Sequence, residues 1–432
     1  MNAVTTIEST TQKAYGWGIS KVLKSHIALH LQNIGKRPEH YLYFEDNRMC
    51  LYTYTDNNML VYESNVHLSN TKAPSSHAYL IELDKLKSII ISRKESDFEV
   101  KVNVDENNVA SIQINMDSFE AILPLSVKFD HFEQLLSMRR IPDEFQCIEL
   151  PLDTALFDAY SNATKFTSED DLKPAMNGVL TTFVRSDAGN ELLLCSTDAH
   201  QMYVNRAIAN VDLTEMQADT VSHIVPSCFI KAAETVANAA KSIGDMDDDS
   251  SAVMRFFDSY VHFECSNFSV HGSYIEGRFP DFYSVLSDIG KYKPLAVIKL
   301  EELQNEVKSM YNSAVITNKV TYLAVLESVK NEFDSVDLTL TTQSTSSATK
   351  VKQSILDVEC HADLADMKIG VNCKLLKTIV DSLDGETAYI YAASPSRPMF
   401  ILTRPLSQSE LDDVKKIREF NIVMPVMLGV GA

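Results

Sequence analysis

The chain has 432 residues and a formal net charge of −20, from 39 basic and 59 acidic residues. Its 45% hydrophobic content and few glycines and prolines exclude a collagen-like or largely disordered protein. No apolar run approaches the ~18 residues of a membrane-spanning helix, the first residues lack a signal-peptide pattern, and the seven cysteines form no CxxC pair. We therefore expect a cytoplasmic protein without a disulfide framework or zinc ribbon, and the length predicts about three domains of ~150 residues.

The acidic excess is concentrated in the middle of the chain. Residues 144–290 hold 8 Lys and Arg against 23 Asp and Glu, whereas residues 1–143 and 291–432 are nearly balanced. So acidic a chain is expected to bind DNA only if its cations are gathered on one surface.

Apolar periodicity predicts an α+β fold in which each third contains two helices and several antiparallel strands. In the first third we expect a helix over 21–34 and a hairpin formed by Phe98–Val104 and Ile112–Met116, where apolar and polar residues alternate. The middle third is expected to begin with a helix over Asp153–Phe166 and to contain a strand at Tyr260–Glu264.

The last third is expected to open with a helix over Leu300–Ala314, in which apolar residues follow helical spacing. A strand is predicted at Val336–Leu340. Two polar stretches, 245–251 and Gln343–Lys352, are interpreted as loops.

A short pattern recurs three times, at Ile81–Lys87, Val225–Lys231 and Val371–Lys377. Each copy is an apolar segment, a polar or small junction and the start of a helix, and the closing lysines are 144 and 146 residues apart. The predicted N-cap residues of these helices are Asp84, Ser227 and Asn372. The repeat predicts three domains, residues 1–143, 144–290 and 291–432.

Every predicted helix carries or adjoins a lysine. The competing interpretation is that lysine is common on any exposed helix face and has no function there. If three pseudo-symmetric units line one concave side with their helices, the lysines collect there and can contact phosphates. No zinc-finger spacing or base-reading helix is present, so such binding would not depend on DNA sequence. These lysines are Lys21, Lys24, Lys85, Lys87, Lys165, Lys231, Lys241, Lys308, Lys374 and Lys377.

Motifs for nucleotide hydrolysis, zinc proteases and serine hydrolases are absent. Asp198 and His200 leave a hydrolase as an alternative, although two residues at this spacing on a strand do not form a base-orienting pair. The acidic run Asp245–Asp249 lacks the glycine and glutamate of a calcium loop. We therefore expect no catalytic residues, no cofactor and no metal.

Five segments from about residue 150 onward occur in the order and spacing of one known family, and a sixth, Leu51–Asp56, fits the strand pair of its first domain. Together they resemble the bacterial sliding clamp, the beta subunit of DNA polymerase III, with the likeness weaker in the first third. The segments are Leu51–Asp56, Met176–Leu180, Leu192–Met202, Glu276–Leu286, Ile369–Asn372 and Val423–Leu428.

The resemblance implies three similar domains per chain and two chains joined head to tail in a ring, with helices lining the hole and sheets outside. Such a homodimer encircles duplex DNA, slides on it, and tethers the replicative DNA polymerase and other partners without catalysing a reaction. An ATP-driven clamp loader is implied as a further partner. A scaffold of three α+β repeats without a DNA role remains the alternative outside the enzyme class.

The resemblance also implies an apolar cleft between the second and third domains that binds partner peptides. Several of its residues are methionines, whose flexible side chains suit a groove that accepts several partners. The cleft residues carried over by position are Met176, Thr197, Ala199, His200, Gln201, Met202, Pro280, Ser284, Val285, Ser396, Pro398, Ile422, Val423, Met424, Pro425, Val426, Met427 and Leu428.

The sequence departs from the family pattern at several positions. Ala199 replaces the usual glycine and Gln201 the usual arginine, which predicts a shallower and less charged cleft floor. An aromatic pair that touches single-stranded DNA in some members falls at Pro174 and Ala175, so we expect that contact to be missing, with Lys173 as a substitute DNA-binding residue.

Overall fold

The computed structural model describes residues 10–14, 38–45, 48–55, 60–67, 78–91, 98–104, 110–116, 119–127, 147–185, 189–214, 218–243, 252–286, 288–333, 335–344 and 348–428. The chain forms two compact units. The first unit comprises residues 1–157, 210–217 and 225–275, and the second comprises residues 158–209, 218–224 and 276–432. No helix in these described ranges is long and apolar enough to cross a membrane. The predicted helix over 21–34, with Lys21 and Lys24, and the predicted loop 245–251 lie outside the described residues.

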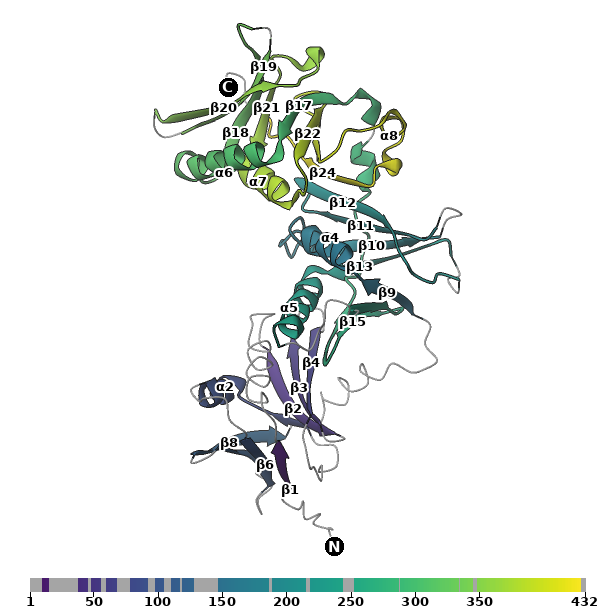
Figure 1. Cartoon of the computed structure of the whole chain (residues 1–432), viewed down its shortest axis with the longest axis vertical. Coiled ribbons are helices and arrows are strands. Elements are labelled where there is room, and N and C mark those ends of the chain that lie inside the picture. Colours follow the sequence, from purple (N-terminus) through teal and green to yellow (C-terminus); the bar gives the residue numbers. More distant parts are fainter. Residues whose placement is uncertain are drawn as a thin grey trace. The chain divides into compact units, whose positions relative to one another are not determined.

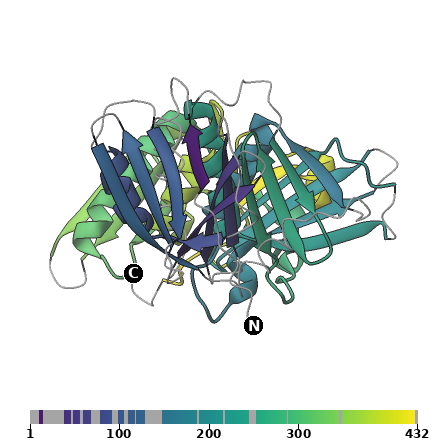
Figure 2. The ribbon, with the colours of Figure 1, turned by 90° about the horizontal axis from the view of Figure 1, so that it is seen from below.

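The first unit is built on one twelve-stranded antiparallel sheet of order β1-β6-β7-β8-β5-β2-β3-β4-β16-β15-β14-β9. Figure 2 shows β6, β7 and β8 as neighbouring blue strands. The strands are β1 (Thr10–Ala14), β2 (Glu39–Glu45), β3 (Arg48–Thr55), β4 (Leu60–His67), β5 (Ala78–Leu80), β6 (Phe98–Val104), β7 (Ala110–Met116), β8 (Phe119–Val127), β9 (Ile148–Leu152), β14 (Ala252–Phe256), β15 (Tyr260–Cys265) and β16 (Phe268–Ser273).

Two helices of the first unit are α2 (Leu83–Ile91) and α5 (Ser227–Ile243). In α2, Leu83 and Leu86 are buried at a spacing of three, which is the pattern of a helix with one apolar face. Helix α5 packs on β15 and β16. Gly272 allows this close approach, because a Cβ there would lie 2.8 Å from Cδ2 of Phe229.

The second unit contains two antiparallel sheets, of order β13-β10-β11-β12-β24-β23-β22-β17 and β20-β19-β18-β21. The strands are β10 (Gly178–Val184), β11 (Glu191–Thr197), β12 (Gln201–Ile208), β13 (Thr220–Pro226), β17 (Lys293–Lys299), β18 (Leu323–Lys330), β19 (Val336–Gln343), β20 (Lys350–Val358), β21 (Lys368–Asn372), β22 (Thr387–Ala392), β23 (Met399–Leu402) and β24 (Glu419–Val423).

The helices of the second unit are α6 (Leu300–Thr317), α7 (Cys373–Ser382), the short α8 (Gln408–Asp412) and most of α4 (Thr154–Thr164), which begins at the boundary between the units. Helices α6 and α7 lie side by side (Figure 1). The ring of Phe166, just after α4, stacks on Tyr203 of β12 with centroids 5.5 Å apart. The short 3₁₀ segments are η2 (Pro174–Met176), η3 (Phe282–Leu286), η4 (Ile289–Lys291), η5 (Ala362–Leu364) and η6 (Val414–Lys416).

One chain order recurs: a strand, a helix and then three strands. Two consecutive repeats form a pair, and the first strand of each one joins the sheet of the other. For example, β17 precedes α6 but pairs with β22 of the next repeat. In the same way, β21 precedes α7 but pairs with β18 of the preceding repeat. The third strands meet one another: β4 pairs with β16, and β12 pairs with β24. The third strands β8 and β20 pair with no other third strand among the described residues. Strand β20 is the edge of its sheet, and the outer edge of β8 pairs with β5 only at Ser126 and Val127.

Several sequence predictions are confirmed. The α+β architecture is present, Phe98–Val104 and Ala110–Met116 form the expected antiparallel pair, and Asn372 caps α7 by accepting hydrogen bonds from the amides of Lys374 and Leu375. Three details were wrong. Gln343 belongs to β19 and Lys350–Lys352 belong to β20, because the two strands pair. Asp84 lies inside the first turn of α2, and Ser227 is the first residue of α5, so neither caps its helix.

A stacked histidine pair is buried in the large sheet. His262 of β15 pairs directly with His271 of β16, and the ring centroids lie 4.3 Å apart. Neither ring nitrogen of His262 has a hydrogen-bond partner in the described part of the chain. Burial, with the charge of nearby Arg255, lowers the pKa of His262 to about 3. The fold therefore requires this imidazole to be neutral.

We predict that His262 makes the fold sensitive to acid. Because its folded-state pKa lies below the unfolded value near 6.5, the unfolded chain takes up the proton first. Stability should be complete above pH 6.5 and fall by several kcal/mol as the pH approaches 3, since one pKa unit corresponds to about 1.4 kcal/mol. His262→Phe should flatten this slope in urea titrations between pH 7 and 4, with His200→Phe as the exposed control. An unchanged slope in His262→Phe would contradict the assignment.

Candidate functional site

The candidate peptide site is organised by the seam between β12 and β24. These strands pair antiparallel from Gln201↔Val423 to Asn205↔Glu419. Two more backbone hydrogen bonds hold the chain after β24. The amide of Met424 donates to the carbonyl of His200 at 2.8 Å, and the amide of Val426 donates to the carbonyl of Gly370 at 2.8 Å. The C-terminal segment, defined as residues 423–428, is therefore held between the turn before β12 and strand β21.

The C-terminal segment presents apolar side chains at the surface. Val423 is fully buried, Met424, Pro425, Val426 and Leu428 are half-buried, and Met427 is 75% exposed. Single exposed apolar residues are common, but a continuous run of six apolar residues that stays partly exposed is a candidate surface for binding another molecule.

The turn before β12 is fixed by short polar contacts. The Asp198 carboxylate accepts hydrogen bonds from the amides of His200 and Gln201, both at 2.8 Å, and the Thr197 hydroxyl accepts from the amide of Ala199 at 3.1 Å. Ala199 has φ +76°, a left-handed conformation that favours glycine. The carboxylate of Asp198 holds the turn, so this geometry offers no support for the hydrolase alternative.

Other predicted cleft residues are linked to this seam through neighbouring contacts. Pro398 is buried beside Met399, which pairs with Val423. Arg206 of β12 donates from Nη2 to the hydroxyl of Tyr283 at 2.8 Å, which holds η3 with Ser284 and Val285 near β12.

The loop with Met176 approaches the segment that carries Pro280. Met176 is half-buried at the end of η2, and a Cβ on Gly277 would lie 3.8 Å from Cβ of Ala175. Ser284 and Ser396 are exposed. All the predicted cleft residues thus lie in the second unit.

The predicted cleft residues include no Asp, Glu, Lys or Arg. Gln201 is 5% exposed, its Nε2 contacts the carbonyl of Lys165 at 3.5 Å, and its Oε1 has no partner in the described part of the chain. A buried amide oxygen without a donor is energetically costly. The position where the family has an arginine therefore holds a neutral and incompletely bonded side chain.

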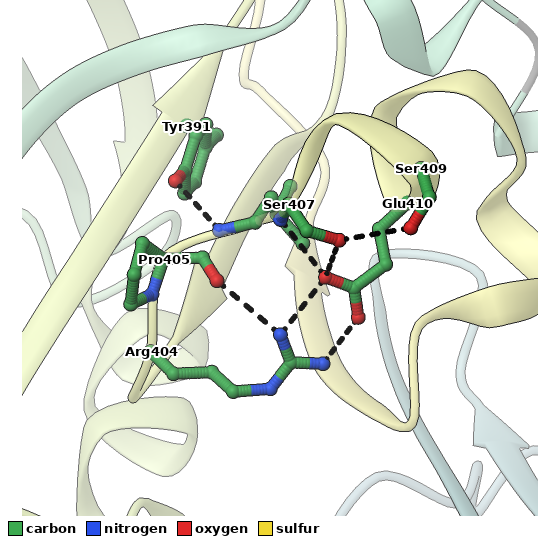
Figure 3. A network of polar contacts seen from close by, with 7 residues as sticks. Tyr391, Arg404, Pro405, Ser407, Ser409 and Glu410 are labelled. Atoms are coloured by element: carbon green, nitrogen blue, oxygen red, sulfur yellow. Dashed lines mark hydrogen bonds and ion pairs between the residues drawn. The ribbon is translucent and has the colours of Figure 1, made fainter.

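A polar network anchors the connector that leads into β24 (Figure 3). Arg404 forms a two-point ion pair with Glu410, whose carboxylate also accepts from the amide and hydroxyl of Ser407 at 2.9 and 2.7 Å. The Tyr391 hydroxyl accepts from the amide of Leu406 at 2.9 Å. The Arg404 guanidinium lowers the pKa of Glu410 to about 2. Sequence reasoning missed this network, although the spacing of Ser407 and Glu410 is that of a helix capping box, which could have indicated part of it.

The predicted DNA-binding lysines in the described ranges are at the surface. On the helices, Lys85, Lys231, Lys241, Lys308 and Lys374 are exposed, while Lys87 and Lys377 are partly exposed. Lys165 and Lys173, which flank the loop after α4, are also exposed. Some are engaged locally: Lys85 pairs with Glu82, Lys165 bonds to Asn162 and Lys377 pairs with Asp381.

Residues 152–281 match the family model of the DNA polymerase III beta subunit, central domain. No curated protein sequence gives a significant match. The chain is similar to the solved sliding clamp of Pseudomonas aeruginosa (TM-score 0.72), to that of Bartonella birtlesii bound to griselimycin (0.74), and to the beta subunit of Thermotoga maritima (0.69), each at 15% identity. These alignments cover 98%, 98% and 97% of this chain and 100% of each of those chains.

The chain therefore has the sliding-clamp fold, and residues 152–281 are similar to the central domain of the DNA polymerase III beta subunit. The resemblance predicted from the sequence motifs is confirmed.

We predict that Gly370→Ala displaces the C-terminal segment. An added Cβ would lie 2.2 Å from the carbonyl oxygen of Val426 and 2.9 Å from Cδ2 of Leu428. Overpacking of this kind costs about 1–3 kcal/mol. The change should accelerate hydrogen exchange at the amides of Met424 and Val426.

Gly290→Ala is the matched control, because its added methyl group meets its nearest atom at 3.3 Å. It should leave those amides protected. Unchanged exchange in Gly370→Ala would show that Gly370 does not hold the segment.

Proposed function

We propose that the chain is a DNA sliding clamp: a ring that encircles duplex DNA and tethers a DNA polymerase for processive synthesis. The observation that carries this proposal is the likeness of nearly the whole chain to bacterial clamps, joined to the beta-subunit match over 152–281. The closed ring keeps the polymerase on its template, so the protein is a processivity factor. We place it in the cytoplasm and assign it no catalytic step of its own. A clamp loader opens it onto DNA.

We further propose that the ring contains two chains of three domains each, residues 1–143, 144–290 and 291–432. Each domain would hold two of the strand–helix–three-strand repeats. Head-to-tail contacts generate a closed ring when the rotation per unit completes a circle. Six similar domains satisfy that condition.

The strand pairing suggests how the ring closes. Third strands join one another within the chain, as β4 joins β16 and β12 joins β24. The two third strands left over are β8, near the start of the chain, and β20, near its end. Pairing of β8 with β20 of a second chain would continue the same rule and bury two exposed edges.

Each of the two edges exposes a large apolar side chain. Strand β8 exposes Ile122 (61%), and strand β20 exposes Leu356 (65%). In an antiparallel pair that places Ile122 opposite Leu356, the two side chains would pack together. The segment at the end of α6, with Ile316 and Val320 at 84% and 91% exposure, supplies further apolar surface for the same contact.

The ring would hold DNA through lysines on its helices, by weak contacts that do not depend on sequence and that permit sliding. The apolar C-terminal segment and the turn before β12 would bind peptides of the polymerase and other partners. A polymerase tethered in this way stays at high effective concentration near the primer end.

Retention on DNA tests the clamp function. Rings are allowed to close around a nicked circular plasmid by concentrating dilute protein in its presence, and free protein is removed by gel filtration. We expect the protein to remain with the circle and to leave within minutes after a restriction enzyme linearises the plasmid, because a sliding ring escapes at a free end. Equal release from circular and linear DNA would reject the proposal.

Substitution of an edge residue tests ring closure. Ile122→Asp or Leu356→Asp would bury a charge in the contact and should weaken the dimer at least tenfold, or about 1.4 kcal/mol. In light scattering of a dilution series, the 48.4 kDa monomer should then appear at concentrations at least tenfold higher than in the wild-type protein. Leu172→Asp, at an 89% exposed position in the loop after α4, is the matched control. Dissociation at the wild-type concentration in both edge variants would exclude this closure.

A further inference from the structure

The turn between β18 and β19, residues 331–335, is held by the side chain of Asn331. Its Oδ1 accepts hydrogen bonds from the amides of Phe333 and Ser335 at 3.0 and 3.1 Å. Its Nδ2 donates to Oδ1 of Asp337 at 3.1 Å, and its own amide donates to the carbonyl of Ser335 at 2.8 Å. These contacts fix the turn and involve only the backbone of Phe333.

The side chain of Phe333 is 88% exposed on this turn. Single exposed apolar side chains are common on protein surfaces, but turns are built mainly from Gly, Pro, Asn, Asp and Ser. Because Asn331 already supplies the hydrogen bonds that the turn needs, the backbone geometry does not require an aromatic residue at this position. The ring of Phe333 is therefore available to contact another molecule.

The surroundings of the turn are acidic. Asp357 of β20 lies beside it, because the amide of Asp357 donates to Oδ1 of Asp337 at 3.1 Å. Among the described residues, the carboxylates of Glu332, Asp337 and Asp357 form no ion pair, whereas Lys368 of the neighbouring β21 is paired with Glu327. Residues 330–337 hold three acidic residues against one basic residue, namely Glu332, Asp334, Asp337 and Lys330.

We propose that this surface, here called the acidic tip and defined as Glu332, Phe333, Asp337 and Asp357, docks a basic segment of a partner protein. An arginine or lysine side chain of the partner lies on the ring of Phe333 and pairs with Glu332. Charge complementarity selects this occupant, since the face of an aromatic ring attracts a cation and the adjacent carboxylates add to the attraction. DNA is repelled by the same carboxylates.

The acidic tip goes beyond the proposed function, because it shares no residue with the candidate peptide site. We expect arginine to bind it better than lysine, since the planar guanidinium can stack on the ring while it donates to a carboxylate. A partner held at both the acidic tip and the peptide site would gain affinity from the higher effective concentration of its second contact.

A charge-neutral substitution tests the acidic tip. The probe is a fluorescent peptide with an arginine on each side of a leucine, titrated at low salt and followed by anisotropy. The net charge of −20 attracts any cationic peptide, so the informative comparison is between variants of equal charge. Phe333→Ser should weaken binding about two- to fivefold. Leu172→Ser, at an 89% exposed position, is the matched control and should bind like the wild-type protein.

The role of Glu332 is tested in the same titration. Glu332→Gln should weaken binding by a factor of about two, and Glu386→Gln, at another exposed position of the second unit, by less. A probe in which lysine replaces arginine should bind more weakly to the wild-type protein. Wild-type affinity in Phe333→Ser, or an equal loss in Leu172→Ser, would overturn the proposal.

A spectroscopic measurement locates the probe. In protein labelled with ¹⁵N-phenylalanine, the amide resonance that is missing from Phe333→Ser belongs to Phe333. It should shift when the arginine peptide is added and stay in place when glutamines replace the arginines. A resonance that does not shift places the probe elsewhere and rejects the proposal. So does a dimer that dissociates more readily in Phe333→Ser, because the surface would then be a contact between two copies of the chain. Retention on circular DNA does not depend on the acidic tip, so failure of the clamp function is a separate result.

Discussion

The fold depends on the pairing of strand edges. Each strand–helix–three-strand repeat ends in a third strand whose outer edge carries backbone donors and acceptors that need partners. The pairs β4–β16 and β12–β24 satisfy these groups within the chain and produce long continuous sheets. The same pairing leaves the helices as a separate solvent-facing layer, so charge on the helices can differ from charge elsewhere on the surface.

The candidate peptide site is a consequence of one such pairing. The register of β12 with β24 places Val423 beside Gln201, and two more backbone hydrogen bonds, to His200 and Gly370, hold the apolar C-terminal segment at the surface. The Arg404–Glu410 pair fixes the connector that enters β24 from the other end. The C-terminal segment is thus positioned by main-chain geometry, while its side chains stay available for a partner.

Local features of the fold could be predicted from the sequence, and distant contacts could not. The cap at Asn372 and the β6–β7 hairpin follow from side chains within a few residues of one another. Lys350–Lys352 looked like a loop because its polar residues lie on an edge strand, where β19 supplies the hydrogen bonds. The cleft residues came from the family resemblance; the contacts that join them, such as Val426 to Gly370, connect positions too far apart for any periodic pattern to indicate.

In the proposed ring, the edges of β8 and β20 that are unpaired among the described residues join two chains. Hydrogen exchange measured across the monomer–dimer transition tests this closure. The outward-facing amides of β20 and of β8 before Ser126 should exchange fast in dilute protein and become protected as the dimer forms, while amides at the β12–β24 seam stay protected throughout. If the protein dimerises but exchange at both edges does not change with concentration, the two chains are joined elsewhere.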